Sequence, residues 1–140
     1  MNSREKGKRG ERQWRDELRA NGYHARRGQQ YAGGGDSPDV VCDELSDFHF
    51  EVKAVERLNI EDAMDQARRD QAGLGSNAAA AAKMPIVAHR RSRRQWLLTM
   101  DAATFFRLLR SFRTGTAPCG GPPLKTNFES IESIESPESK

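Results

Sequence analysis

The sequence predicts one α/β domain, in which helices flank a central mixed sheet of about five strands. Two kinds of segment indicate this fold class. Short apolar segments with the alternation of strands occur between residues 23 and 100, and segments with helical spacing of apolar residues precede, separate and follow them. A length of 140 residues suits a single domain, which we expect over residues 1–114.

The charge is unevenly distributed along the chain. The formal net charge is +3, yet residues 115–140 are net acidic, so the preceding residues form a basic part. Residues 115–140 are also rich in Gly, Pro, Ser and Glu, which predicts a disordered acidic tail. A basic domain suits binding to a polyanion, and a solvated charged surface explains the same charge equally well.

Simple features argue against several protein classes. Cys42 and Cys119 lie far apart and have no metal-ligand spacing, so neither a disulfide framework nor a zinc site is predicted. No apolar run is long enough to span a membrane, so we expect no membrane partner. The charged N-terminus lacks the apolar core of a secretory signal, and a cytoplasmic location is therefore expected.

The first helix is predicted over residues 4–21. Trp14 and Leu18 lie four residues apart, as on one helical stripe, and Asn21-Gly22 is typical of a helix end. The outer face of this helix is basic and is a candidate surface for phosphate contacts. Its basic residues are Arg4, Lys8, Arg12, Arg15 and Arg19.

Glu11 falls on the apolar stripe of this helix, three residues before Trp14. A carboxylate on an inward-facing stripe needs a partner, because burial of an unpaired charge is costly. A metal ion or Lys53 would supply one. An ion pair with Arg15 on the helix surface is the alternative.

A first strand is predicted over residues 23–30, and it carries Arg26 and Arg27. The following loop, residues 29–37, contains three consecutive glycines, which let a backbone approach a ligand closely. The loop lacks the lysine of a nucleotide-binding P-loop.

The central pattern of the chain is a hairpin with strands at residues 40–41 and 48–52. Side chains alternate along a strand, so Glu51 and Lys53 lie together with His49 on one face, opposite an apolar face. If Asp39 opens the paired strand, its carboxylate reaches the same place. Two carboxylates and a lysine at the end of a sheet can bind a divalent cation and position a water molecule.

A second helix is predicted to start after Asn59, with Asp62 in the third position beyond it. Its buried stripe consists of Ile60, Ala63, Met64 and Ala67. Gln66 lies one step off this stripe and faces either the carboxylates or solvent. The alanine-rich residues 77–83 extend the helix or form a loop.

A second hairpin is predicted from residues 85–89 and 95–100. Its turn is densely basic and carries Arg90, Arg91, Arg93 and Arg94. Contact with a DNA backbone is one interpretation of this turn, and a solvated loop is the other.

Asp101 is predicted to cap a last helix, whose apolar residues share one stripe. They are Phe105, Leu108, Leu109 and Phe112. We expect this stripe in the core, and a dimer interface is the alternative.

Pro38-Asp39 followed by Glu51-x-Lys53 resembles the signature of the PD-(D/E)xK nucleases. The order of the surrounding features is similar to archaeal-type Holliday-junction resolvases and their phage-encoded relatives. These features are Gly10-Glu11-Arg12 in the first helix, the glycine-rich loop, and Gln66 in the helix after Lys53. The resemblance extends over residues 8–109.

The resemblance implies a restriction-endonuclease-like fold and a Mg²⁺-dependent DNA endonuclease, in which Mn²⁺ substitutes for Mg²⁺. The implied catalytic residues are Glu11, Asp39, Glu51 and Lys53, and the implied metal ligands are Asp39, Glu51 and the Val52 carbonyl. Gln66 and Ser37 match supporting positions, although Ser37 directly precedes Pro38. The implied products carry a 5′-phosphate and a 3′-hydroxyl.

The expected partner is branched or duplex DNA, in a prokaryotic or phage-infected cell, and the expected assembly is a homodimer. The expected DNA contacts are Lys8, Arg12, Arg26, Arg27, Arg90, Arg91, Arg93 and Arg94. Two alternatives remain open at this point. One is a repair, restriction or flap nuclease of the same superfamily, and the other is a non-catalytic DNA-binding module.

Overall fold

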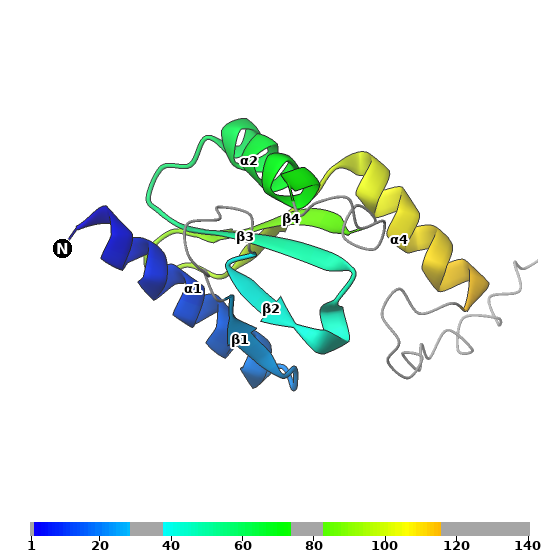
Figure 1. Cartoon of the computed structure of the whole chain (residues 1–140), viewed down its shortest axis with the longest axis horizontal. Helices are drawn as coiled ribbons and strands as arrows, with labels where there is room; N and C mark the ends of the chain where they lie inside the picture. Colours follow the sequence, from blue (N-terminus) through cyan, green and yellow to red (C-terminus); the bar gives the residue numbers. More distant parts are fainter. Residues whose placement is uncertain (1, 29–37, 74–82, 116–140) are drawn as a thin grey trace, which may run out of the picture.

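Five short strands form one mixed sheet in the computed structural model, which describes residues 2–28, 38–73 and 83–115 (Figure 1). The strand order is β1-β2-β3-β4-β5. The elements are α1 (Ser3–Ala20), β1 (Ala25–Arg27), β2 (Val40–Cys42), the 3₁₀ turn η1 (Asp43–Leu45), β3 (Phe48–Ala54), α2 (Ile60–Gly73), β4 (Met84–Arg90), β5 (Leu97–Thr99) and α4 (Ala102–Thr114). The expected α/β class with a mixed sheet is confirmed.

The parallel pair β3 and β4 forms the centre of the sheet. Their register runs from Phe48 opposite Met84 to Ala54 opposite Arg90, and the other neighbouring strands pair antiparallel. Parallel neighbours need a long crossover, which α2 supplies. Both predicted hairpins, β2–β3 and β4–β5, are present.

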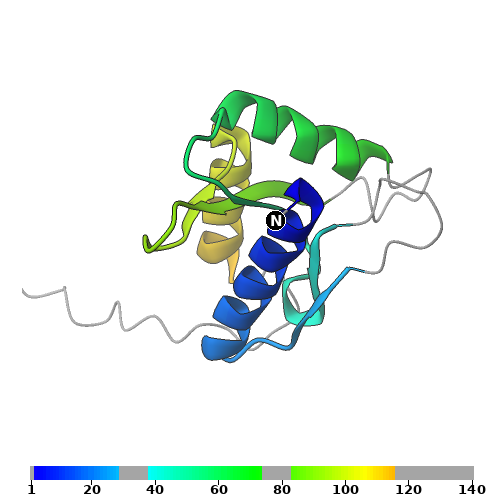
Figure 2. The same ribbon diagram turned by 90° about the vertical axis from the view of Figure 1, so that its left-hand side faces the viewer.

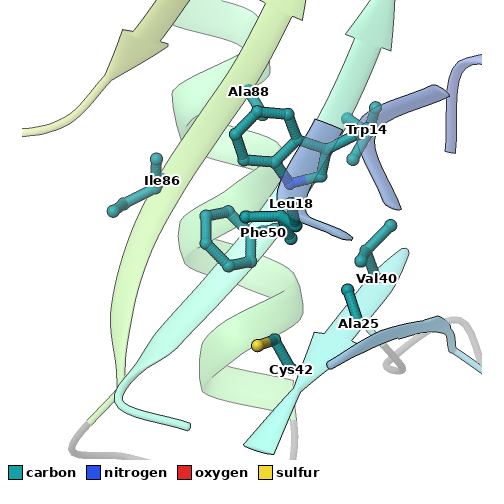
Figure 3. Packing of buried hydrophobic residues seen from close by; sticks show 9 residues of the cluster. Trp14, Leu18, Ala25, Val40, Cys42, Phe50, Ile86 and Ala88 are labelled. Carbon is teal, nitrogen blue, oxygen red and sulfur yellow. The ribbon is translucent and has the colours of Figure 1, made fainter. Parts of the chain in front are cut away.

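The helix α1 covers one face of the sheet. Trp14 and Leu18 are buried against the apolar side chains of β3, with the Trp14 and Phe50 rings 5.5 Å apart (Figure 3). The cluster continues across the sheet through Val40, Cys42, Ala25, Ile86 and Ala88. The stripe predicted for the first helix is therefore the stripe that packs.

The helix α2 lies on the opposite face (Figure 2). Ala63, Met64 and Ala67 pack against Val87 of β4. The helix begins as predicted, because the Asn59 side chain accepts a hydrogen bond of 3.3 Å from the Asp62 N–H. With a helix on each face, His49 and Glu51 of β3 are buried as well as Phe50 and Val52.

The last helix, α4, corrects the prediction of a core stripe. Phe105 is 49%, Leu109 41% and Phe112 53% exposed, and the buried residue of the helix is Thr104. Figure 1 shows α4 running away from the sheet, whose two faces α1 and α2 already cover. The apolar spacing was read correctly, but it could not indicate what lies against the stripe.

Asp101 occupies the N-cap position of α4 without the expected capping hydrogen bond from its side chain. The Asp101 carboxylate instead forms an ion pair with Arg68 of α2, including a hydrogen bond of 3.3 Å from Arg68 Nε. This ion pair fixes the start of α4 beside α2.

Several predictions concern residues outside the described ranges. The glycine-rich loop with Ser37, most of the alanine-rich segment and residues 116–140 lie there. The first strand is shorter than predicted, with β1 at Ala25–Arg27. In the described part of the chain, no helix is long and apolar enough to cross a membrane.

Gly10 lets α1 approach β3 closely, because a Cβ atom at this position would lie 3.0 Å from the Ala54 Cβ. We predict that Gly10→Ala destabilises the protein relative to Gly7→Ala, whose added Cβ meets nothing within 4 Å. Gly7→Ala gains about 1 kcal/mol of helix propensity, and Gly10→Ala offsets that gain by overpacking that costs about 1–3 kcal/mol. Urea unfolding of both variants measures the difference. Equal stabilisation by both would show that the close approach is unimportant.

Candidate functional site

Asp39, Glu51 and Lys53 meet at the end of β3, as the sequence predicted. The Asp39 Oδ2 atom accepts a hydrogen bond of 2.9 Å from the Val52 N–H. The Lys53 Nζ atom lies 2.7 Å from Glu51 Oε1, and this glutamate is only 4% exposed. The site thus joins the residue before β2 to three consecutive residues of β3.

The Val52 carbonyl faces the same side of β3 as Asp39. In an extended strand, the N–H and C=O groups of one residue point to the same side. Because the Val52 N–H is directed at the Asp39 carboxylate, the carbonyl of Val52 is directed toward that side too. The backbone oxygen expected as a metal ligand therefore lies on the side from which Asp39 approaches.

The side chain of Gln66 faces the candidate site and not solvent. Its Oε1 atom accepts a hydrogen bond of 2.9 Å from Lys53 Nζ. The α2 helix, which packs on this face of the sheet, brings Gln66 over the end of β3. Lys53 is thus held between Glu51 and Gln66. Together these two contacts use two of the three ammonium donors.

Glu11 has a partner that the sequence did not suggest. Arg27 of β1 donates a hydrogen bond of 2.8 Å from its Nε to Glu11 Oε2, and Glu11 is 18% exposed at its side chain. Arg15, the alternative surface partner, pairs with Asp16 instead. Helix spacing could not reveal the pair with Arg27, because it forms only when β1 folds back beside α1.

A cleft of about 390 Å³ opens in front of Asp39 and Glu11. Arg4, Lys8 and Arg27 line it, so its walls carry both signs of charge. A larger hollow of about 620 Å³ lies near Tyr23, away from the predicted catalytic residues. The smaller cleft is the one that Asp39 and Glu11 line.

The negative charge of the carboxylates in this site is not fully balanced by nearby positive side chains. Burial, reinforced by the nearby charge of Glu51, raises the pKa of Asp39 from 3.8 to about 7, against the opposing hydrogen bond from Val52. Burial also raises the pKa of Glu51, against the opposing effect of Lys53. Glu11 adds negative potential at both residues. An added cation would relieve this repulsion.

The donor set suits a hard divalent cation. Asp39, Glu51 and the Val52 carbonyl supply only oxygen atoms, which Mg²⁺ and Mn²⁺ prefer. Within the described ranges, no three His, Cys, Asp or Glu side chains form a ready-made metal cluster. Mg²⁺ commonly uses one or two protein carboxylates and completes its shell with water and substrate phosphate, so the residues present fit.

The basic residues predicted to contact DNA differ in their exposure and in their ion pairs. Arg12 is exposed on α1, and Lys8 forms only a long ion pair of 3.7 Å with Glu5. Arg26 pairs with Asp43 at 3.5 Å, and Arg27 is held by Glu11 as described above. Arg27 therefore serves Glu11 rather than forming an open contact surface.

The arginine-rich turn lies at the same end of the sheet as the candidate site. Arg90 is opposite Ala54 in the parallel register, one residue beyond Lys53. Its guanidinium packs 5.0 Å from the centre of the Trp96 ring. The next three arginines of the turn, Arg91, Arg93 and Arg94, are exposed.

The sequence did not predict the surroundings of two residues near Glu51, which are Asp70 and His49. Asp70 of α2 adds to the negative potential at Glu51, and no local motif indicated it. His49 is 1% exposed, and neither ring nitrogen has a hydrogen-bond partner among the described residues. Burial lowers the pKa of His49, so it is a neutral core residue here.

Comparison of the chain with models of protein families, with curated proteins and with solved structures finds no match. The resemblance to nucleases therefore depends on the motif residues and on their arrangement at the end of β3.

The raised pKa of Asp39 predicts a pH-dependent stability in the absence of metal. A native pKa near 7, above the ordinary 3.8, means that protonated Asp39 favours folding at low pH and that this contribution is lost as the pH rises through about 7. Asp39→Asn keeps an acceptor for the Val52 N–H but cannot ionise. We predict that the variant gains stability relative to wild type between pH 4 and pH 8, measured by Tm in chelator. A constant difference over that range would show that Asp39 titrates normally.

Proposed function

We propose that the protein is a metal-dependent endonuclease that hydrolyses phosphodiester bonds in DNA. The observation that carries the proposal is the meeting of Asp39, Glu51 and Lys53 at one strand end, through the Asp39–Val52 hydrogen bond. Asp39 lines a cleft whose walls include Arg4, Lys8 and Arg27, and we propose that a phosphate group enters it. The raised pKa values of both carboxylates are typical of functional sites.

Asp39, Glu51 and the Val52 carbonyl would hold Mg²⁺, and Mn²⁺ would substitute for it. When bound, the cation polarises the scissile phosphate and acidifies a water molecule. The protein's own contribution is to fix both carboxylates and to oppose their protonation. The hydrogen bond from the Val52 N–H does this for Asp39, and the Lys53 ammonium does it for Glu51.

Lys53 has the second chemical role. Its ammonium donates to the phosphate oxygens on which negative charge builds during in-line attack, or it orients the attacking water. Gln66 and Glu51 hold the ammonium in place, so that little reorganisation is needed when substrate arrives. Glu11, held by Arg27, supplies further negative potential beside the cation.

DNA is proposed to lie across the end of the sheet. Arg4 and Lys8 line the cleft on one side, and the arginine turn lies beyond β3 and β4 on the other. Contacts of this type are made to phosphates and position the duplex without reading its sequence. They suit an enzyme that recognises the structure of its substrate.

The proposed substrate class is branched DNA, with a four-way junction as the preferred member. Resolution of a junction needs two symmetric incisions, which a C2 homodimer supplies from two identical sites. This finer assignment depends on the resemblance to resolvases, and light scattering tests the assembly. A monomer that cuts linear, flap and junction DNA equally would leave only the broader nuclease function.

We predict that Asp39→Asn, Glu51→Gln and Lys53→Ala each reduce cleavage by more than about a hundredfold, since each removes a charge at the reacting phosphate. Matched linear, flap and four-way-junction DNAs with Mg²⁺ provide the assay, and circular dichroism checks the fold. Glu17→Gln, an exposed change on α1, is the matched control and should retain full activity. Near wild-type cleavage by any of the three variants would refute the site assignment.

We predict that removal of positive charge from the turn weakens DNA binding uniformly across sequences. Replacing Arg91, Arg93 and Arg94 by glutamine should lower the slope of log K against log salt by about 0.9 for each lost phosphate contact. Arg90 is left in place because it packs on Trp96.

The matched control for the turn variant removes the same charge from α4. Arg107, Arg110 and Arg113 replaced by glutamine should leave the salt slope unchanged, because α4 lies away from the end of β3 at which the site is built (Figure 1). An equal slope in wild type and in the turn variant would assign the turn to ordinary solvated surface.

A further inference from the structure

The α4 helix leaves an apolar face uncovered in the described structure. Phe106 is 54%, Leu109 41% and Phe112 53% exposed. Large aromatic and aliphatic side chains gathered on one exposed helix face mark a binding surface. We refer to these three residues as the α4 apolar face.

The sequence of α4 repeats every three residues. An apolar residue is followed by arginine at Phe106-Arg107, Leu109-Arg110 and Phe112-Arg113. No acidic residue occurs in α4. Residues three apart lie on neighbouring positions of one helix face, so an arginine row runs beside the α4 apolar face.

A later part of the chain repeats the same pattern with the opposite charge. Residues 128–136 read Phe128-Glu129-Ser130, Ile131-Glu132-Ser133 and Ile134-Glu135-Ser136. Each apolar residue is followed by glutamate where α4 has arginine. The two segments thus match in period, in number of repeats and in the position of the charge, while their charges are complementary.

We propose that residues 128–136 dock on the α4 apolar face of the same chain. Phe128, Ile131 and Ile134 cover the three apolar side chains of α4, which removes apolar surface from water. The glutamates lie beside the arginine row, which fixes the alignment of the two segments. This occupant replaces the earlier expectation of a tail without contacts, and the inference does not depend on the nuclease activity.

The connection is long enough for this docking. Gly115 ends α4 with a left-handed φ of 67°, so the chain turns away from the helix axis there. Residues 116–127 can span up to about 40 Å, whereas the 13 residues of α4 extend over about 20 Å. Closing a loop of this length costs only slightly more than closing a shorter one.

A second copy of the chain is the competing occupant of the face. The tail has the advantage of attachment, because a tethered segment has an effective concentration in the millimolar range. Charge also favours the tail, since a second α4 would bring another arginine row against the first.

Hydrogen exchange of the full chain, followed by mass spectrometry, tests the docking. In a variant with Phe128→Ser, Ile131→Ser and Ile134→Ser, the amides of α4 should exchange about tenfold faster or more than in wild type, because an uncovered helix opens locally. The matched control carries Ser130→Ala, Ser133→Ala and Ser136→Ala, which leave the apolar and charged rows intact. Its α4 amides should exchange as in wild type.

A charge exchange gives a second, independent readout. Arg110→Glu with Arg113→Glu should accelerate exchange in α4, and adding Glu132→Arg with Glu135→Arg should restore wild-type protection. Protection that is unaffected by the tail variants would overturn the proposal. If the protection of the α4 amides instead falls on dilution, with or without the tail substitutions, a second copy of the chain covers the α4 apolar face. That result would also overturn the proposal.

Discussion

The hydrogen bond from the Val52 N–H to the Asp39 carboxylate is the interaction on which the candidate site depends. Strands β2 and β3 share a single register pair, Val40 opposite Phe50, so their ladder ends just before the site. The Asp39 side chain supplies the next acceptor where the backbone of β2 no longer reaches. A carboxylate is thereby fixed beside Glu51 and Lys53.

The remaining elements place charge around this bond. The close approach of α1 at Gly10 brings Glu11 toward the end of β3, and α2 brings Gln66 to Lys53 from the other face. The result is an excess of buried negative charge, which costs stability in the absence of a cation. Proteins tolerate such local costs where a bound ligand offsets them.

Much of this arrangement could be predicted from the sequence because it is local. Alternation along β3 placed Glu51 and Lys53 on one face, and the Asn59 cap set the start of α2. What failed depends on contacts between distant segments. The Glu11–Arg27 pair requires β1 to fold beside α1, and Asp70 approaches Glu51 only after α2 has packed.

The error at α4 has a different physical origin. Apolar spacing at i, i+3, i+4 and i+7 establishes that a helix has a face to cover, but the same spacing arises whether the cover is the core or another segment. Both faces of the sheet were already occupied by α1 and α2, a fact of topology rather than of local pattern. The exposed Phe112 of α4 shows the consequence.

Calorimetric titration with Mn²⁺ at pH 8 tests the central claim most directly. It measures whether this site, with its excess of negative charge, binds a divalent cation at all. The account predicts saturable binding to the wild-type protein, strong loss of that binding in Asp39→Asn, and no change in Glu17→Gln. Identical titration curves for wild type and Asp39→Asn would contradict it, since the Asp39 carboxylate would then have no part in holding a metal ion.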